Sequence, residues 1–432
     1  MRKIFMCFLI VGVFSYPLLA RPQQPQKGKP ILSDLIQEAL DNNPRLDAAV
    51  QRVLSAERAI PQAGALPDPK ITLGLMNLPM NSFTFDQEPM TGKQIAVMQM
   101  FPFPGKLALS TDMAEFEATA VRHQKEEVQN QIIQMVKRAY YDLYAVDHAT
   151  ETVQRNKDLM GQLIRVVEIK YATGSGLQQD VLRSHVELSK LEDDLIMWKQ
   201  KRLTITAKLN SVLNRPANTP FDTTPQDLDP PAQLDLALAP DEIEQQRPLL
   251  RAWREKIQKA ETAVKFARRD RWPNITVGAS YSQRDDLETG AKMHDFFSAS
   301  VTLDIPLYVK RKQNQKIAER QLEMKAAEAE YQNVLNEVLA EIESLKAELE
   351  RNRKRVELYK GGILLQAQQS LESAQAGYQV GKVDFLTVVD NWMRLLNYEL
   401  QYHFALADYH KALANYDFST GAKLSWRVMT TE

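Results

Sequence analysis

Two long stretches of this chain, residues 106–171 and 309–378, contain no proline and repeat apolar side chains at spacings of three and four. This spacing places the apolar side chains on one face of an α-helix. At 1.5 Å per residue, the first stretch would be roughly 100 Å long, far beyond an ordinary globular helix. A helix of this length needs partners along its whole length, so the sequence predicts a coiled-coil-like assembly.

Each long stretch is followed by a glycine turn and a second helical stretch, at residues 177–213 and 385–418. Glycine permits the left-handed backbone in which helices commonly end, so each pair is predicted to form a helical hairpin. The first long helix is expected to begin at about residue 105. The residues predicted to form the two hairpin tips are Tyr171, Gly174, Gly176, Tyr378, Val380 and Gly381.

Short segments of alternating apolar and polar residues precede each hairpin, and strands are predicted at 70–77, 93–101, 274–282 and 296–305. Side chains in a strand alternate between two faces. One face of these strands is apolar, whereas the other is mostly small or hydroxyl-bearing and also carries Met98 and Met100. The apolar residues expected to meet lipid are Ile71, Leu73, Leu75, Ile275, Val277, Phe297, Val301 and Leu303.

The second half of the chain repeats the first. Pro69, Ile71, Val97 and Pro102 each have an identical residue type 204 positions later. The fold class is therefore mostly α with a small β part, built from a duplicated unit of helix, two strands and a long helical hairpin. The predicted division is a first repeat at 21–213, a proline-rich linker at 214–240, a second repeat at 241–418 and a C-terminal tail at 419–432.

Residues 1–20 are predicted to be a secretory signal peptide, because Arg2 and Lys3 precede a short apolar core at 4–13. A retained N-terminal anchor is the alternative. No other stretch is long and apolar enough for a transmembrane helix. The formal net charge of −1 gives no basic field of the kind that nucleic-acid-binding proteins carry.

Four strands are too few to close a β-barrel, which needs about eight. Open strand edges in a bilayer would leave backbone groups without hydrogen-bond partners, so further copies of the chain are expected to complete the sheet. Three copies would supply twelve strands and two copies eight. The alternative is a soluble sheet half-buried against helices.

Taken together, these features resemble the TolC-like outer-membrane efflux channels over nearly the whole chain after residue 20. The matching features are the order of the elements, the strand-ending Pro102 and Pro306, and two Tyr-x-x-Gly motifs with an aspartate beyond them, at 171–180 and 378–390. Within that family, the runs at 64–69 and 99–106 are similar to the branch that serves heavy-metal (copper/silver-type) RND exporters.

The resemblance implies a homotrimer in the outer membrane of a Gram-negative bacterium, with a twelve-stranded β-barrel in contact with lipid and a long periplasmic α-helical barrel. It implies a passive channel with no enzymatic activity, no cofactor and no nucleic-acid partner. Metal ions or small toxic solutes would be delivered by an RND-type inner-membrane pump and a periplasmic adaptor (membrane fusion) protein. Two alternatives stay open: a periplasmic coiled-coil adaptor or scaffold, and the same channel serving a drug or protein exporter.

Acidic residues just beyond the tips are candidates for the channel aperture. With three-fold symmetry, Asp180 and Asp390 would each form a ring of three carboxylates, which attracts cations and raises the pKa of its members. Thr387 occupies the position in the second repeat that corresponds to Asp180. The alternative is that these aspartates are ordinary solvated helix residues.

Two further features concern the strand region. Met76, Met80 and Met90 offer thioether ligands for soft Cu(I) or Ag(I), although methionine more often serves as a packing residue, and no firm metal site is predicted. Trp272 precedes a strand and is predicted to anchor that strand at the membrane interface. No phosphate-binding, metalloprotease or nucleophile motif is present in the sequence.

Overall fold

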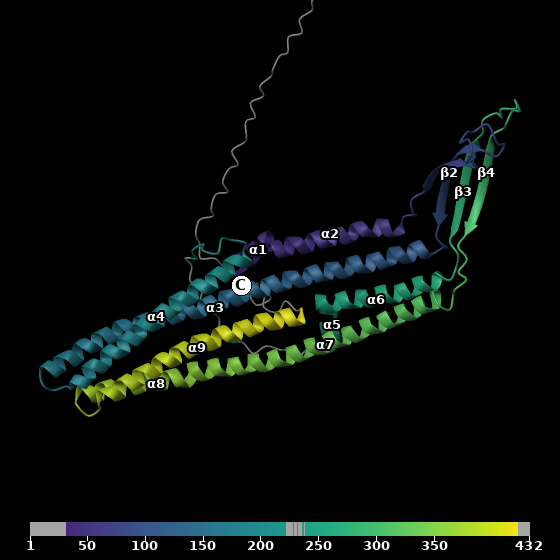
Figure 1. The fold of residues 1–432 in the computed structure, drawn as a ribbon. Coiled ribbons are helices and arrows are strands. Elements are labelled where there is room, and N and C mark those ends of the chain that lie inside the picture. Colours follow the sequence, from purple (N-terminus) through teal and green to yellow (C-terminus); the bar gives the residue numbers. More distant parts are fainter. Residues whose placement is uncertain (1–31, 222–227, 229–230, 232–235, 237, 422–432) are drawn as a thin grey trace, which may run out of the picture.

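The computed structural model describes residues 32–221, 228, 231, 236 and 238–421. The predicted signal peptide and most of the predicted tail lie outside the described residues. Long helices run side by side in an elongated body, with a small sheet at one end (Figure 1). At the other end lie the two hairpin turns, where one helix reverses into the next.

The described part of the first half of the chain contains four helices, of which α3 is a single helix of 67 residues. Asn43 caps α2 by accepting a hydrogen bond on its side chain from the backbone of Arg45. A backbone N–H at the first helical position has no acceptor within the helix, so Pro44, which has no N–H, fits there without the loss of a hydrogen bond. The four helices are α1 (Leu32–Asn42), α2 (Pro44–Gly64), α3 (Lys106–Ala172) and α4 (Gln178–Val212).

The second half departs from its predicted elements in one important respect. The single helix predicted at 309–378 is interrupted by a five-residue π-helical turn, η1, which contains Gly361 and Gly362, two residues with a weak preference for α-helix. The α-helix also starts later than residue 309, because residues 307–312 form turns. The elements are α5 (Pro240–Gln246), α6 (Pro248–Arg269), α7 (Gln313–Leu358), η1 (Tyr359–Ile363), α8 (Leu364–Gln379) and α9 (Phe385–Thr420).

Helix α3 is the centre of the packing, since it contacts α2, α4, α6 and α9, while α7 packs on α6 and α9. The largest apolar core joins α1, α3, α4 and α9 through buried side chains that include Leu143, Val153, Leu209 and Val388. The two hairpins therefore share one core. Within the described residues, no helix is both long and apolar enough to cross a membrane.

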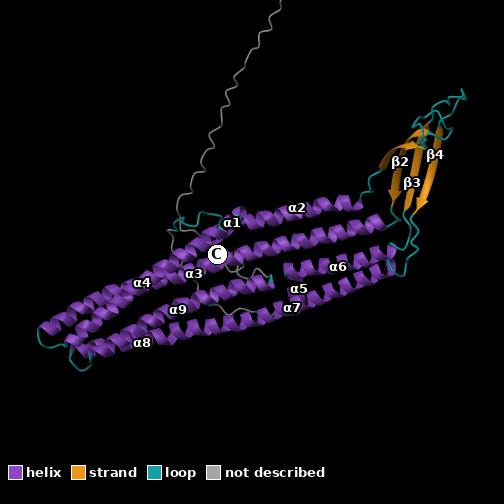
Figure 2. Ribbon diagram, viewed as in Figure 1, coloured by secondary structure: helices purple, strands orange, loops and turns teal. Residues whose placement is uncertain are grey.

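The sheet has the order β1 (Lys70–Met76), β2 (Gly92–Phe101), β3 (Ile275–Gln283) and β4 (Phe296–Leu303), with every neighbouring pair antiparallel (Figure 2). The repeats meet at the β2–β3 pair. In the described chain β1 and β4 each have one neighbour, so their outer edges carry unpaired backbone groups. The last strand ends at Leu303, two residues before its predicted end.

Both sheet faces follow the predicted alternation. Exposed residues on the apolar face include Leu73 and Phe297, each at 75%. Gln99 is the polar exception on this face. Its side-chain amide donates to the carbonyl of Pro67 at 2.7 Å, just before β1 begins, which explains a polar side chain at that end of the strand.

A buried ion pair ties α6 to α3 and α9 in the middle of the body. The Arg247 guanidinium lies 2.7 Å from the Glu127 carboxylate, donates to the carbonyl of Phe418 and covers the Phe418 ring at 4.1 Å. The Arg247 side chain is only 4% exposed. Burial raises the pKa of Glu127 even though Arg247 opposes the shift.

Candidate functional site

The two hairpin turns at the far end of the helical body have the same backbone hydrogen bonds. At the first turn the N–H of Ser175 donates to the carbonyl of Lys170, and at the second the N–H of Lys382 donates to that of Gly377, both at 2.9 Å. A second hydrogen bond that spans fewer residues accompanies each, from the N–H of Gly174 to the carbonyl of Tyr171 at 3.0 Å and from the N–H of Gly381 to the carbonyl of Tyr378 at 3.2 Å. This is the Schellman arrangement, so the duplication extends to the detail of the tips.

Glycine is required at the two turn positions by the backbone itself. Gly174 has φ +71° and Gly381 has φ +75°, a left-handed conformation that is costly for residues with a Cβ atom. Gly176, also predicted at the tip, has a different role. A Cβ there would lie 3.0 Å from the backbone nitrogen of Tyr171, so a close approach of the chain explains it.

The structure joins the two tips through a contact that sequence analysis did not find. The ammonium group of Lys170 donates to the carbonyl of Tyr378 at 3.0 Å and lies 3.9 Å from the centroid of its ring. The Tyr378 ring packs in turn on Phe385, with centroids 5.7 Å apart. Phe385 is buried with Val167 of α3, so an apolar cluster lies under the contact. The available signal was the basic residue directly before the first tip tyrosine.

The predicted aperture residues divide into two groups. Asp180 is half-buried near Asp384, and burial, with a smaller contribution from the Asp384 charge, raises the pKa of Asp180. Asp384 itself caps α9, because its carboxylate accepts the N–H of Thr387 at 2.8 Å. Asp390 instead forms an exposed ion pair with Arg394 at 2.9 Å. Asp384 and Arg394 are charged neighbours that sequence analysis missed.

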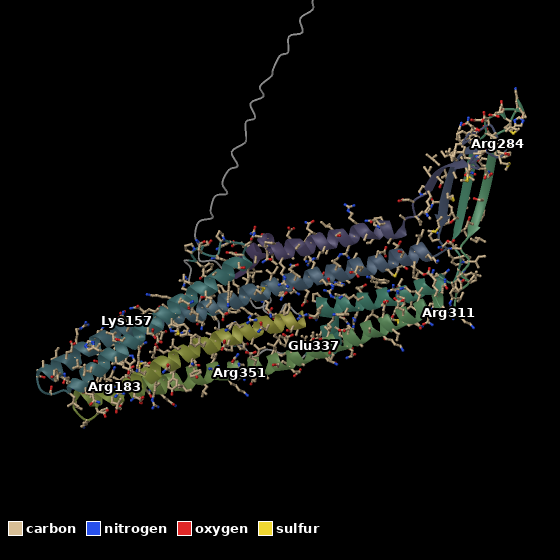
Figure 3. The ribbon with its side chains drawn as sticks, in the orientation of Figure 1. Lys157, Arg183, Arg284, Arg311, Glu337 and Arg351 are labelled. Carbon is tan, nitrogen blue, oxygen red and sulfur yellow. The ribbon has the colours of Figure 1, made fainter. Side chains whose placement is uncertain are left out.

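The tips carry exposed apolar side chains that no described residue covers. Tyr171 is 48% exposed and Val380 is 68% exposed, and Leu177 at the start of α4 is 65% exposed. Basic Arg183, in the first turns of α4, lies close to the hairpin tips and is partly exposed (Figure 3). Turns that expose apolar groups at the end of a long hairpin are suited to contact with another protein.

The predicted lipid-facing residues all lie on the same exposed face of the sheet. Their pairing is continuous across the strands, since Ile71 faces Val97 in register, and Val277 faces Val301. All eight are exposed, from 40% at Ile275 to 75% at Leu73 and Phe297: Ile71, Leu73, Leu75, Ile275, Val277, Phe297, Val301 and Leu303.

The predicted methionine ligands are not brought into a defined site. Met80 and Met90 are exposed in the loop between β1 and β2, and Met76 ends β1 on the polar face. Met98 packs across Gly278 on that same face, at the level of Ser300. Among the described residues, no group of three or more His, Cys, Asp or Glu side chains is arranged to hold a metal ion.

Comparison with known proteins gives the same duplicated pattern. A family model described as "Outer membrane efflux protein" matches residues 35–215 and again residues 239–422. The two matches correspond to the two repeats.

Three curated relatives match most of the chain. The pyoverdine export outer membrane protein OpmQ of Pseudomonas aeruginosa is 23% identical over 84% of this chain and 79% of its own length. The outer membrane protein TolC of Vibrio cholerae is 22% identical over 84% of each chain. The cobalt-zinc-cadmium resistance protein CzcC of Cupriavidus metallidurans is 21% identical over 88% of this chain and 87% of its own length.

A solved structure shares the fold. The outer membrane protein VceC of Vibrio cholerae superimposes with a TM-score of 0.76 at 19% identity, over 90% of this chain and 96% of VceC.

Proposed function

Because this chain belongs to the outer membrane efflux protein family, whose members are channels and not enzymes, we propose that it is the passive outer-membrane conduit of a tripartite efflux system. The protein lies in the outer membrane and extends into the periplasm, as its relatives do. The family assignment removes the alternative of a periplasmic adaptor or scaffold. An inner-membrane pump, of RND type, and a periplasmic adaptor would deliver the solute.

One observation supports the assembly above all others. Among the residues that the structure describes, the sheet has four strands with two open edges, at β1 and β4, and exposes one continuous apolar face. Unpaired backbone groups are not stable in hydrocarbon, so both edges need strands from other copies. Three copies would form a twelve-stranded barrel with the apolar face toward lipid and the hydroxyl-bearing face toward water. The helical hairpins would continue this barrel as a tunnel across the periplasm.

The tips would form the entrance of the tunnel. Tyr171, Gly174, Gly176, Tyr378, Val380 and Gly381 would contact the adaptor, and Asp180, Thr387 and Asp390 would line the aperture. Exposed Val380 and Tyr171 support adaptor contact, and the carboxylates support a preference for cations at the narrow end.

The assembly is tested on the full chain extracted from membranes in detergent. Light scattering should give the mass of three copies, and the same sample should conduct ions after insertion into planar bilayers. A stable single copy that does not conduct would contradict the proposal.

The proposed cargo is a metal ion of the copper or silver type. The run at 99–106 and the likeness to a cobalt-zinc-cadmium resistance protein support a metal. The likeness to a pyoverdine exporter favours a second candidate, a small organic solute. A deletion strain should become sensitive to copper and silver and recover with the wild-type chain. Unchanged metal tolerance together with impaired export of an organic solute would favour the second candidate.

A further inference from the structure

We propose that the junction between the helical body and the sheet binds the headgroups of anionic phospholipids. The binding surface, called here the basic junction patch, lies where α6 ends and α7 begins. This inference rests on the proposed function, because the junction between helices and sheet can contact lipid if the strands are inserted in a membrane. The patch consists of Arg268, Arg269, Arg271, Lys310, Arg311 and Lys312.

Two segments far apart in the sequence form this patch. Helices α6 and α7 pack along each other, and the guanidinium of Arg271 donates to the side-chain carbonyl of Asn314 at 2.8 Å. The strands that leave these helices pair directly, with Ile275 opposite Leu303. Figure 3 shows Arg311 at the start of α7, where the helical body meets the strands.

The positive charge of the patch is not balanced within the described chain. All six side chains are exposed, and no described carboxylate lies within 4.0 Å of their charged groups. The nearest acidic residue in the sequence, Asp270, is already paired with Lys106 at 2.9 Å. Within the described ranges, Arg269 donates to the backbone carbonyl of Pro104 and to no carboxylate. The patch therefore presents guanidinium and ammonium donors to whatever surrounds it.

The charges at the start of α7 oppose the helix dipole. The N-terminus of a helix carries a partial positive charge, which acidic residues normally offset. Helix α9 has Asp384 as its cap and α4 has Asp180 in its first turn. Helix α7 has no acidic residue in its first turn and no side-chain cap, and Lys310, Arg311 and Lys312 come directly before it. An external anion would relieve this repulsion.

Exposed apolar and aromatic side chains lie between the patch and the lipid-facing rows. Leu307 is 80% exposed, Tyr308 is 74% exposed, and Trp272 is 58% exposed with its ring stacked on Phe103 at 5.3 Å. Tryptophan and tyrosine are favoured at the boundary between hydrocarbon and headgroups. Along the chain the order is thus apolar strand, amphipathic ring, then cation, which matches hydrocarbon, interface and headgroup in one leaflet.

The first repeat shows that the fold does not need these charges. Of the six equivalent positions there, one alone carries a cation, Lys106, and that side chain is buried against Asp270. Five of the six basic side chains therefore have no basic counterpart in the first repeat, and the sixth, Lys310, corresponds to a lysine that is buried. The equivalent positions, 204 residues earlier, are Gly64, Ala65, Pro67, Lys106, Leu107 and Ala108.

The chemistry of the patch favours a phosphate group attached to lipid. One guanidinium group can donate two parallel hydrogen bonds to two oxygens of the same phosphate. Each basic residue near an anionic membrane surface strengthens binding by about five-fold. An acidic protein would satisfy the charges but would not explain exposed Leu307 and Tyr308 next to the membrane rows.

The test uses the purified full chain in mixed micelles that contain phosphatidylglycerol or phosphatidylethanolamine, with bound lipid measured by native mass spectrometry. The wild type should retain phosphatidylglycerol preferentially. Lys310→Gln/Arg311→Gln/Lys312→Gln should lower the affinity for phosphatidylglycerol on the order of a hundred-fold and leave phosphatidylethanolamine binding unchanged. The matched control, Lys199→Gln/Lys208→Gln/Lys325→Gln, removes three exposed cations from other helix surfaces and should behave as wild type.

Equal retention of the two lipids by the wild type, or an unchanged triple variant, would overturn the inference. So would loss of the preference on addition of inorganic phosphate at the lipid concentration, since the patch would then be a free-phosphate site. Oligomer mass and bilayer conductance are measured on the same samples. A conducting trimer without lipid preference contradicts only this inference, whereas a chain that neither assembles nor conducts contradicts the proposed function.

Discussion

The Lys170 ammonium group donates to the main-chain carbonyl of Tyr378 at 3.0 Å and lies over the ring of the same residue at 3.9 Å. The two residues lie in the final turns of α3 and α8. This contact fastens one hairpin tip to the other within a single chain. Separation of the tips therefore requires its loss.

Replacement of Lys170 by methionine keeps a long apolar side chain but removes the donor and the charge. A hydrogen bond of this kind contributes about 1 kcal/mol, so for each subunit whose tips must separate the ratio of open to closed channels should rise about five-fold. Lys170→Arg should stay near the wild type. Single-channel recording in planar bilayers measures the ratio, with Lys199→Met as control. An open fraction equal to that of the wild type would show that the contact does not hold the entrance.

Acidification should narrow the entrance through Asp180. Burial, and secondarily the charge of Asp384, raises the pKa of Asp180. A raised carboxylate pKa means that the folded tip is relatively more stable at low pH, and that this contribution is lost as the pH rises through the raised value. Protonation of Asp180 removes its repulsion from Asp384 and its attraction for cations. Conductance and cation selectivity should therefore fall as the pH decreases, at a pH above that at which an ordinary aspartate titrates.

Asp180→Asn should remove this pH response and give low selectivity at neutral pH as well. The control is Asp158→Asn, which changes an exposed residue of α3. Its conductance and cation selectivity should depend on pH as those of the wild type do. A pH response that persists in Asp180→Asn would assign it to another group.

The glycines of the π-helical turn should be replaceable with a gain in stability. A Cβ at Gly361 or Gly362 meets no atom within 4 Å, and neither residue has a positive φ. Each change to alanine should raise the free energy of unfolding by about 0.4–1 kcal/mol, because the unfolded chain loses freedom. Thermal unfolding in detergent measures the shift. Gly381→Ala is the control with the opposite expected sign, since its φ of +75° strains alanine. A lower midpoint for Gly361→Ala would contradict this reading of the turn.

Removal of one partner of the buried pair between Arg247 and Glu127 should be strongly destabilising. Arg247→Met leaves the Glu127 carboxylate buried without its guanidinium, at a cost of about 3–5 kcal/mol. The double variant Arg247→Met/Glu127→Leu should recover much of that loss. Denaturant unfolding of the detergent-solubilised protein measures both values. Equal stability of the single variant and the wild type would mean that water reaches the carboxylate.

The two faces of β1 should respond differently to charge. Leu73→Arg puts a cation on the exposed apolar face, which costs roughly 2–4 kcal/mol near the middle of a bilayer. Thr72→Arg puts the same cation on the opposite face. The amount of assembled oligomer in outer-membrane fractions should fall for the first variant and stay near the wild type for the second. The reverse order would place the hydroxyl-bearing face toward lipid.

Much of the architecture could be predicted from sequence because its patterns are long. The absence of proline over 106–171 and the alternation of the strands extend over enough residues for the period to dominate local propensity. The π-helical turn at Tyr359–Ile363 could not be predicted in this way, since five residues are too few for a change of period to be recognised between two long α-helices. Pairing of β2 with β3 is likewise a tertiary choice that no local signal carries.

The candidate site was predicted less completely than the fold. Gly174 and Gly381 were recognisable because their backbone conformation requires a particular residue type. Lys170 and Asp384 were missed because their importance comes from the other hairpin, whose side chains approach only after folding.

In the proposed trimer, the edges of β1 and β4 that are unpaired in the described chain make the stability of the sheet a collective property of three copies. A barrel closed by three copies exists in equilibrium with separate chains according to the third power of their concentration. Until it assembles with other copies, each newly made chain would have two strand edges with unpaired backbone groups. Such edges can pair with other chains, so the unassembled chain would be prone to aggregation and to proteolysis. Gene dosage and chaperone supply should therefore affect the yield of this protein more steeply than they affect a chain that completes its own sheet.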